Sequence, residues 1–281
     1  LQEESALRDE LRALGLAGDL GPERIAEARR LFARAIETPG GLRIQTIHSF
    51  CAALLRRFPL EAGVSPQFTE MDDRAAELLR AEVIEALASG PEAGVIDAMA
   101  EAFTGEDFTA LAAEIASHRE LFGPVPEFDE ILGWVGLPPG FDEAGVLETA
   151  FDGSEAGLMA ALCPVLLGQS KSYASVGRAL AAHDWSEPDR AAFETLSEHF
   201  LYRSGNRLNT SKAGNWPQPN HTSARAAVEP LLPELDAMME RVAEARQAEL
   251  ALAAARRTQV LHRFADAFLT AYAARKARRG V

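Results

Sequence analysis

The sequence contains one short run, Thr46-Ile47-His48-Ser49-Phe50-Cys51, whose polar side chains have a spacing that could bind an anion. The expected order is strand, tight turn and helix, with Thr46 ending the strand and His48 and Ser49 starting the helix. The first backbone N–H groups of a helix have no partner inside it, so such a corner can hold an anionic oxygen. The same residues also allow a purely structural interpretation, in which Ser49 only caps the helix and His48 is a buried, hydrogen-bonded side chain.

Motifs typical of catalytic and metal-binding proteins are missing from the sequence. It contains no G-x-x-x-x-G-K-[ST] loop for a triphosphate, no G-x-S-x-G, no H-E-x-x-H and no C-x-x-C. Two cysteines cannot build a four-thiolate metal site, and the six histidines show no ligand spacing. We therefore expect this chain to hold no catalytic residue, no metal and no cofactor, and to be inactive as an enzyme on its own.

Charge is distributed unevenly along the 281 residues, whose net charge is −14. Residues 60–163 hold 22 acidic and 3 basic side chains and should repel nucleic acid. Residues 203–225 hold four basic side chains and no acidic one, and residues 253–281 carry a net charge of +6. Any contact with a polyanion must therefore be local, and the acidic block indicates either a solvated face or a surface that meets a partner.

The sequence has no apolar run of about eighteen residues, so we expect no transmembrane helix and no membrane partner. It has no signal-peptide pattern. Its start at Leu1 and its stop at Val281, directly after a basic segment, indicate a piece of a longer protein.

Alanine and leucine dominate and β-branched residues are sparse, so we predict a mostly α fold. Two short runs, residues 42–46 and 67–71, are expected strands because turn residues precede each of them. With the helix between them they form a β–α–β unit at about residues 40–72, and a two-stranded parallel sheet of this kind must belong to a larger α/β core. Helices are predicted over residues 2–14, 22–37, 49–58, 73–88, 92–102, 107–121, 155–162, 174–183 and 187–201.

Three further expectations concern the parts between and after these elements. Residues 124–153 should form loops with short helices, and residues 203–222 a long surface loop, because both stretches are rich in proline and glycine. Neither proline nor glycine occurs between Pro233 and Gly280, which predicts one long helix or two nearly continuous ones. In the helix over 49–58 we expect Phe50, Leu54 and Leu55 to pack inward and Arg56 and Arg57 to lie nearer to solvent.

The run over residues 44–58, followed by residues 63–72, resembles a DNA-contacting stretch of superfamily 1 helicases of the UvrD, PcrA and RecB kind. In those helicases a T-x-H-S run and a helix with Leu-Leu-Arg-Arg follow a strand of the first motor domain. The AddA-type helicase–nucleases of bacterial double-strand break repair are the most similar, through Phe58-Pro59-Leu60-Glu61-Ala62-Gly63-Val64. Weaker likenesses cover residues 200–212 and 272–280, whereas residues 73–199 resemble nothing that we can name.

The resemblance implies a mostly α fragment of a helicase with a small β–α–β remnant of a P-loop motor domain. It divides the chain into an edge of motor domain 1A (residues 1–72), a helical 1B-like subdomain (73–255) and a helix returning to 1A (256–281). It implies sequence-independent contacts of Thr46, His48 and Ser49 with the backbone of single-stranded DNA. The longer protein would use ATP and magnesium, work in the bacterial cytoplasm and bind an AddB-like partner subunit, but its nucleotide-binding, nuclease and iron–sulfur residues are missing here.

The positions of further cations in the sequence, and not the resemblance, make them candidates for DNA contacts. Arg56 and Arg57 lie on the same helix as the polar corner and could add DNA contacts, or they are solvated surface arginines. Three cations of the acid-free loop, Arg203, Arg207 and Lys212, could meet duplex DNA, or the loop is simply polar and flexible. The basic end of the chain fits a helix C-terminus better than a DNA contact. A second function class also stays open, a helical protein–protein interaction module that docks a partner through its acidic face.

Overall fold

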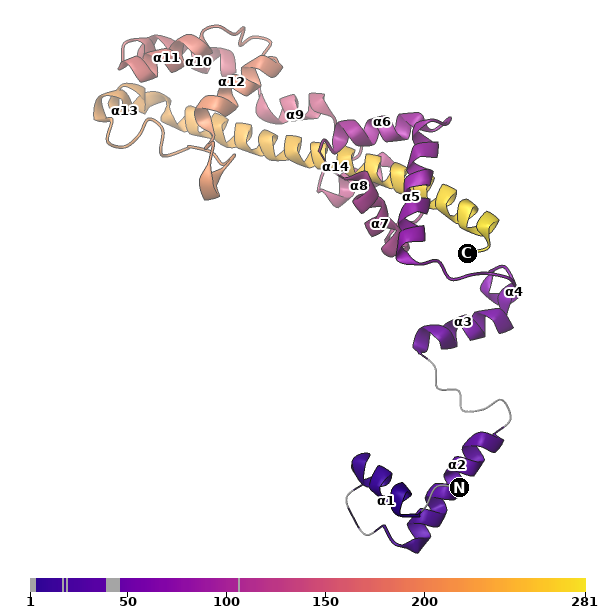
Figure 1. Ribbon diagram of the computed structural model, residues 1–281. Coiled ribbons are helices and arrows are strands. Elements are labelled where there is room, and N and C mark those ends of the chain that lie inside the picture. Colours follow the sequence, from indigo (N-terminus) through magenta and orange to yellow (C-terminus); the bar gives the residue numbers. More distant parts are fainter. Residues whose placement is uncertain (1–3, 17, 19, 39–45, 106) are drawn as a thin grey trace. The chain divides into compact units, whose positions relative to one another are not determined.

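The computed structural model describes residues 4–281 apart from residues 17, 19, 39–45 and 106 (Figure 1). Every regular element among the described residues is a helix, so the prediction of a mostly α fold is confirmed. The α-helices are α1 (Glu4–Ala13), α2 (Pro22–Glu37), α3 (Ile47–Arg57), α4 (Pro59–Ala62), α5 (Asp73–Ala88), α6 (Ala93–Ala102), α7 (Phe108–Ser117), α8 (Phe128–Trp134), α9 (Glu143–Ala150), α10 (Glu155–Leu167), α11 (Lys171–Leu180), α12 (Arg190–Phe200), α13 (Thr222–Val228) and α14 (Leu232–Arg279). Short 3₁₀ helices are η1 (Arg119–Leu121), η2 (Gly205–Arg207) and η3 (Glu229–Leu231).

The predicted β–α–β unit is not seen. The expected first strand lies outside the described residues except for Thr46, which caps α3, and residues 67–71 are irregular. A strand needs a neighbouring strand for its backbone groups, and the described residues offer none here. The segment uses its backbone otherwise, since the Phe68 N–H donates to the Ser65 carbonyl at 3.0 Å and the Thr69 N–H donates to the Gly280 carbonyl at 2.9 Å.

The chain divides into two compact units, one comprising Leu1–Glu70 with Ala277–Val281 and the other Met71–Lys276. The division at residues 72 and 255 that the helicase resemblance implies remains a prediction. In the first unit, α1 and α2 are linked by Arg8, whose side chain donates to the Leu20 carbonyl at 3.1 Å. Leu20 and Ile25 are buried beside this contact, whereas α1 buries no residue of its own.

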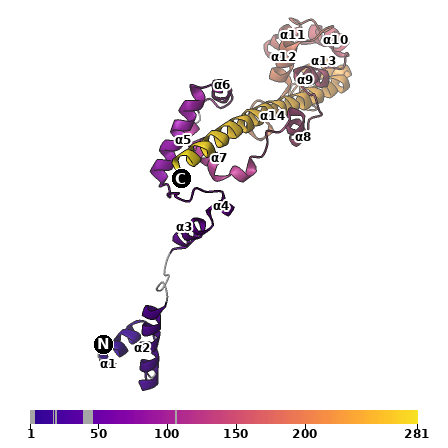
Figure 2. The same cartoon turned by 90° about the vertical axis from the view of Figure 1, so that its right-hand side faces the viewer.

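The second unit is organised along α14, the long helix that the absence of proline and glycine predicts (Figure 1). The first half of α14 contributes Met239 and Val242 to a large apolar cluster that includes Phe193 and Phe200 of α12. Its second half contributes Phe264 and Phe268 to a smaller cluster with residues of α5, α6 and α7. Figure 2 shows the same arrangement from the side, with α5 and α7 near the end of α14 and α10 to α13 near its beginning. Helix α14 therefore contributes residues to both of the apolar clusters described here.

An ion group joins the start of α10 to α14. The Glu155 carboxylate is fully buried and accepts from Arg241 at 2.9 Å and from the backbone N–H of Gly153 at 2.9 Å. Arg241 also pairs with Asp152 at 3.0 Å. A buried carboxylate requires such partners, so this group fixes where α10 meets α14.

The helices α10 and α11 approach each other closely at Gly177. A Cβ atom added at Gly177 would lie 2.9 Å from the Cβ of Leu166, which is closer than side chains normally approach. Glycine is therefore required at this position for packing and not for a turn.

Among the described residues, no single helix is long and apolar enough to cross a membrane. Helices α9 and α10, which are bent by 61° relative to each other, reach the length and apolar composition of a membrane span only when they are counted together.

Candidate nucleic-acid interface

Thr46, His48 and Ser49 lie at the N-terminus of α3, but Thr46 caps the helix instead of ending a strand, and the helix begins at Ile47 instead of at residue 49. Thr46 is the N-cap in an extended conformation, and its hydroxyl oxygen accepts from the Ser49 N–H at 3.2 Å. The hydroxyl groups of Thr46 and Ser49 lie 3.0 Å apart. The two hydroxyls carry two hydrogens and need only one of them between themselves, so the other is available to an external acceptor.

The structural interpretation of this corner is wrong in two details. The cap is Thr46, and Ser49 is the third residue inside the helix. His48 is exposed rather than buried, as are Thr46 and Ser49. The three polar side chains of the corner are therefore accessible to solvent, as contact with an external anion requires.

Arg56 and Arg57 lie in the last turn of α3, ten and eleven residues after the cap. At a rise of about 1.5 Å per residue they are about 15 Å from Thr46 along the helix axis. Both are exposed, with the Arg56 guanidinium 5.3 Å from the centre of the Phe68 ring and that of Arg57 5.8 Å from the centre of the Phe58 ring. A bound strand would have to run along α3 to touch both the corner and these arginines.

The expectation that Phe50, Leu54 and Leu55 pack inward is wrong. Phe50 and Leu54 are exposed and Leu55 is half-buried, whereas the helix buries Ala52. Helical periodicity identifies an apolar face, but whether another element covers that face depends on residues far away in the sequence.

The predicted loop over 203–222 begins as a hairpin-like turn that the sequence analysis missed. Leu201 and Ser211 form an antiparallel bridge, and the Lys212 N–H donates to the Phe200 carbonyl at 2.9 Å. Asn209 adopts a left-handed conformation with φ of 61°. Asparagine tolerates this conformation better than most residues, and it is the signal that could have located the turn.

The three cations of this loop all have partners. Arg203 pairs with Glu198 at 2.9 Å, and Arg207 lies over the ring of Tyr202 at 4.7 Å from its centre. The Lys212 ammonium donates to the His199 carbonyl at 2.8 Å. The side chains of Lys212 and His199 are half-buried, and this burial lowers the pKa of each.

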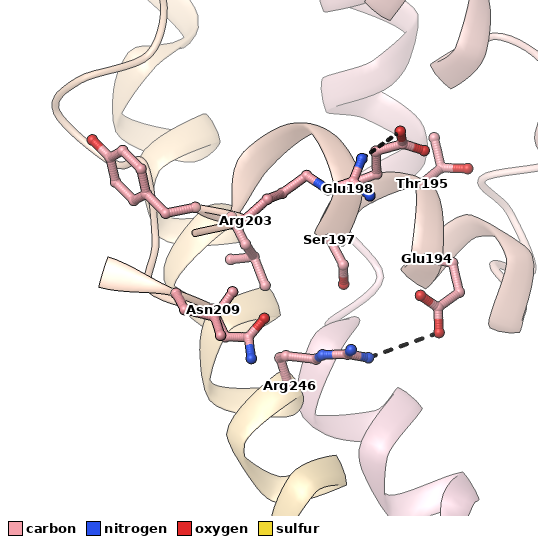
Figure 3. A pocket seen from close by; sticks show the side chains of 10 residues that line it. Glu194, Thr195, Ser197, Glu198, Arg203, Asn209 and Arg246 are labelled. Carbon is pink, nitrogen blue, oxygen red and sulfur yellow. Dashed lines mark hydrogen bonds and ion pairs between the residues drawn. The ribbon is translucent and has the colours of Figure 1, made fainter. Parts of the chain in front are cut away.

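A polar hollow of about 390 Å³ lies between α12, the turn and α14 (Figure 3). The side chains of Ser197, Asn209 and Arg246 point into it, while Glu198 and Glu194 on its rim pair with Arg203 and Arg246. The Ser197 hydroxyl is buried and has no hydrogen-bond partner among the described residues. Each arginine here is paired with a carboxylate, so the positive charge around the hollow is largely offset.

No group of three or more His, Cys, Asp or Glu side chains among the described residues is placed to hold a metal ion. Cys51 is exposed and Cys163 is buried, and both are free thiols. Burial raises the pKa of the Cys163 thiol, which disfavours the reactive thiolate.

The structure thus brings Thr46, His48 and Ser49 together at one helix end and places Arg56 and Arg57 at the other end of the same helix. Arg203, Arg207 and Lys212 gather separately around the turn after α12. Comparison with protein-family models, with curated proteins and with solved structures finds no match for this chain.

Proposed function

We propose that this chain is a non-catalytic part of an ATP-dependent DNA helicase–nuclease of bacterial double-strand break repair, and that α3 holds the backbone of single-stranded DNA. The helicase–nuclease part of the proposal rests on the resemblance of residues 44–58 and 63–72, and the DNA contact rests on the N-terminus of α3, where Thr46, His48 and Ser49 are all exposed. The absence of any acidic residue from Thr38 to Leu60 adds support, since no carboxylate of that stretch repels a phosphate.

In this proposal a phosphate oxygen lies over the first turn of α3. It accepts from the free backbone N–H groups and from the hydroxyl pair of Thr46 and Ser49, with His48 beside it. Arg56 and Arg57 attract a second phosphate further along the helix. None of these contacts reads a base, as a protein that moves along any sequence requires.

The sequence lacks a phosphate-binding loop, so ATP and magnesium would be held by other parts of the longer cytoplasmic protein, and no step of ATP hydrolysis is assigned to this chain. Arg203 and Arg207 would face duplex DNA, with Lys212 at the base of the turn that carries them. The acidic block at residues 60–163 would remain available to an AddB-like partner subunit.

Titration with fluorescent single-stranded homopolymers over a salt series tests the proposal. We expect weak binding that is equal for different bases, with log K falling by about 0.7 per contacted phosphate for each unit of log salt. The double substitution His48→Ala with Arg56→Ala should weaken binding equally for all homopolymers and reduce the slope.

The matched control is Arg24→Ala, which removes an exposed arginine from α2 of the same unit. If the control and the double variant weaken binding equally, the affinity is only diffuse charge and α3 is not the site. Unchanged binding in the double variant would favour the protein–protein module with its acidic face instead.

A further inference from the structure

The hollow between α12, the turn that follows it and α14 contains a hydroxyl group that the fold does not use (Figure 3). Ser197 is only 9% exposed, and its hydroxyl has no hydrogen-bond partner among the described residues. A serine inside a helix can donate to the carbonyl three or four residues earlier, but this side chain points into the hollow instead. A buried polar group without a partner costs free energy, and a ligand in the hollow would supply the missing partner.

The amide of Asn209 is a second polar group that points into the same hollow (Figure 3). The backbone N–H of Asn209 donates to the Tyr202 carbonyl at 2.7 Å, whereas its side-chain amide has no hydrogen bond among the described residues. An amide has a donor and an acceptor side by side, and a hydroxyl can act as either. The two groups together therefore suit a ligand with donors and acceptors along one edge.

The charged side chains that line the hollow compensate one another. Arg203 pairs with Glu198 at 2.9 Å, and Arg246 lies 3.9 Å from Glu194 and also pairs with Glu249. A charged ligand would have to replace one of these partners, whereas an uncharged ligand leaves all of them in place. The charge balance therefore favours an uncharged ligand.

The hollow also offers surfaces for the faces of a flat ring. Leu201 and Leu208 are apolar lining residues. The hydrogen bonds of a guanidinium group lie in its plane, so the ion pairs of Arg246 leave its flat faces available for stacking. The volume of about 390 Å³ is within the range of sites that bind small molecules.

We propose that this hollow binds a nucleobase, an uncharged flat ring with two faces for stacking and one edge of hydrogen-bonding groups. The edge bonds to the Ser197 hydroxyl and the Asn209 amide, while one face stacks on the Arg246 guanidinium. A sugar fits less well, because its many hydroxyl groups need more partners than two free side chains provide. A free amino acid fits less well, because its ammonium and carboxylate groups need unpaired charges.

The base can belong to a free nucleoside or to an unpaired nucleotide of a nucleic acid, and the recognition chemistry is the same in both cases. The lining residues of the hollow belong to the unit Met71–Lys276, whereas α3 belongs to the other unit. A free nucleoside carries no phosphate, so its binding does not use the backbone contacts proposed for α3. The nucleobase proposal therefore does not depend on the DNA contact of α3.

The test uses the whole chain, the four deoxynucleosides and deoxyribose, with binding measured by saturation-transfer difference NMR. At least one nucleoside should bind with a Kd of about 0.1–1 mM, whereas deoxyribose should not bind. The double substitution Ser197→Ala with Asn209→Gly should weaken nucleoside binding by about tenfold or more, because two hydrogen bonds are lost. Glycine suits the φ of 61° at residue 209, so the turn should be retained.

The matched control is Ser204→Ala with Asn206→Ala, which removes the same two groups from exposed positions that do not line the hollow. This control should leave nucleoside binding unchanged. Ser197→Ala alone should leave the unliganded chain at least as stable in urea unfolding, because the hydroxyl has no partner to lose. A clear loss of stability would mean that the hydroxyl has a structural role, and this would overturn the proposal.

A DNA hairpin with one unpaired nucleotide distinguishes the two sources of the base. If the hairpin binds more tightly than the nucleoside and loses this advantage when the unpaired nucleotide is abasic, the base belongs to a nucleic acid. Equal affinities of hairpin and nucleoside would identify a free nucleoside as the ligand. The proposal is overturned if no nucleoside binds, if deoxyribose binds equally well, or if the control weakens binding as much as the double variant.

The nucleoside assay also separates this site from α3. The variant His48→Ala with Arg56→Ala should bind nucleosides as the unsubstituted chain does, since neither residue lines the hollow. Failure of nucleoside binding would leave the salt-dependent binding of single-stranded DNA by α3 as a separate question with its own test.

Discussion

The ion group between α10 and α14 allows a quantitative prediction about stability. Glu155 is fully buried, and besides Arg241 its carboxylate accepts only backbone N–H groups, those of Asp152 at 3.2 Å and Gly153 at 2.9 Å, among the described residues. The Arg241 side chain is 24% exposed. Arg241→Met would leave the buried carboxylate without its cation, a loss that costs about 3–5 kcal/mol at fully buried sites. Because water reaches part of this site, we expect about 3 kcal/mol.

Removing the charge of Glu155 instead of that of Arg241 should lower the free energy of unfolding by less. Glu155→Gln keeps the shape of the side chain and one acceptor oxygen, and Arg241 retains Asp152 at 3.0 Å. We expect a loss of about 1.5–2 kcal/mol for this variant. The double variant leaves neither charge unpaired, so its loss should be smaller than the sum of the single losses by about 1–3 kcal/mol.

Urea unfolding monitored by circular dichroism measures these free energies, and thermal unfolding should show a decrease of about 6–12 °C for Arg241→Met. The control is Arg203→Met, because Arg203 pairs with Glu198 at 2.9 Å on the surface, with side chains 70% and 58% exposed. It should change the free energy of unfolding by no more than about 1 kcal/mol. Additive losses in the double variant, or an Arg241→Met variant as stable as the control, would refute the reasoning.

Two other substitutions test packing and pH dependence. Gly177→Ala should lower the free energy of unfolding by about 1–2 kcal/mol, because overpacking against α10 outweighs the gain in helix propensity. Gly157→Ala, where a Cβ meets nothing within 4 Å, should stabilise by up to about 1 kcal/mol, and equal effects in urea unfolding would contradict the packing argument. Burial, with smaller contributions from nearby cations, lowers the pKa of His199 below its ordinary 6.5. The unfolded state then binds more protons, so stability is complete above about pH 6.5 and falls as the pH decreases through the folded pKa. His199→Gln should flatten this fall in unfolding curves between pH 7 and 5, and an unchanged pH dependence of stability in this variant would contradict the assignment.

The elements that could be predicted from the sequence are those whose causes are local. The long helix α14 follows from a stretch without proline or glycine, and the helix predicted over residues 22–37 coincides with α2, which has a proline in its first turn. Helix propensity and capping act within one or two turns, so a single sequence contains what they need.

The features that could not be predicted depend on distant residues. Residues 67–71 have the composition of a strand, but the described residues offer no strand to pair with, and the Thr69 N–H instead bonds to Gly280, more than two hundred residues later. Phe50 and Leu54 form a regular apolar stripe, yet no pattern within α3 states whether anything covers it. The turn at Asn209 likewise depends on pairing between Leu201 and Ser211.

The existing contacts of Arg203, Arg207 and Lys212 determine how much free energy each side chain would lose by moving to contact DNA. Arg203 would give up an exposed ion pair worth about 0–1 kcal/mol, and Arg207 a surface cation–π contact worth about 0.5–1 kcal/mol. Lys212 would give up a hydrogen bond to the His199 carbonyl from a half-buried position, and bonds to charged groups contribute about 1.5–3 kcal/mol. Several phosphate contacts could offset the first two losses at moderate salt, but Lys212 holds the base of the turn that presents the two arginines. We therefore expect Arg203 and Arg207 to make any contact with a duplex, and Lys212 to act by keeping them in place.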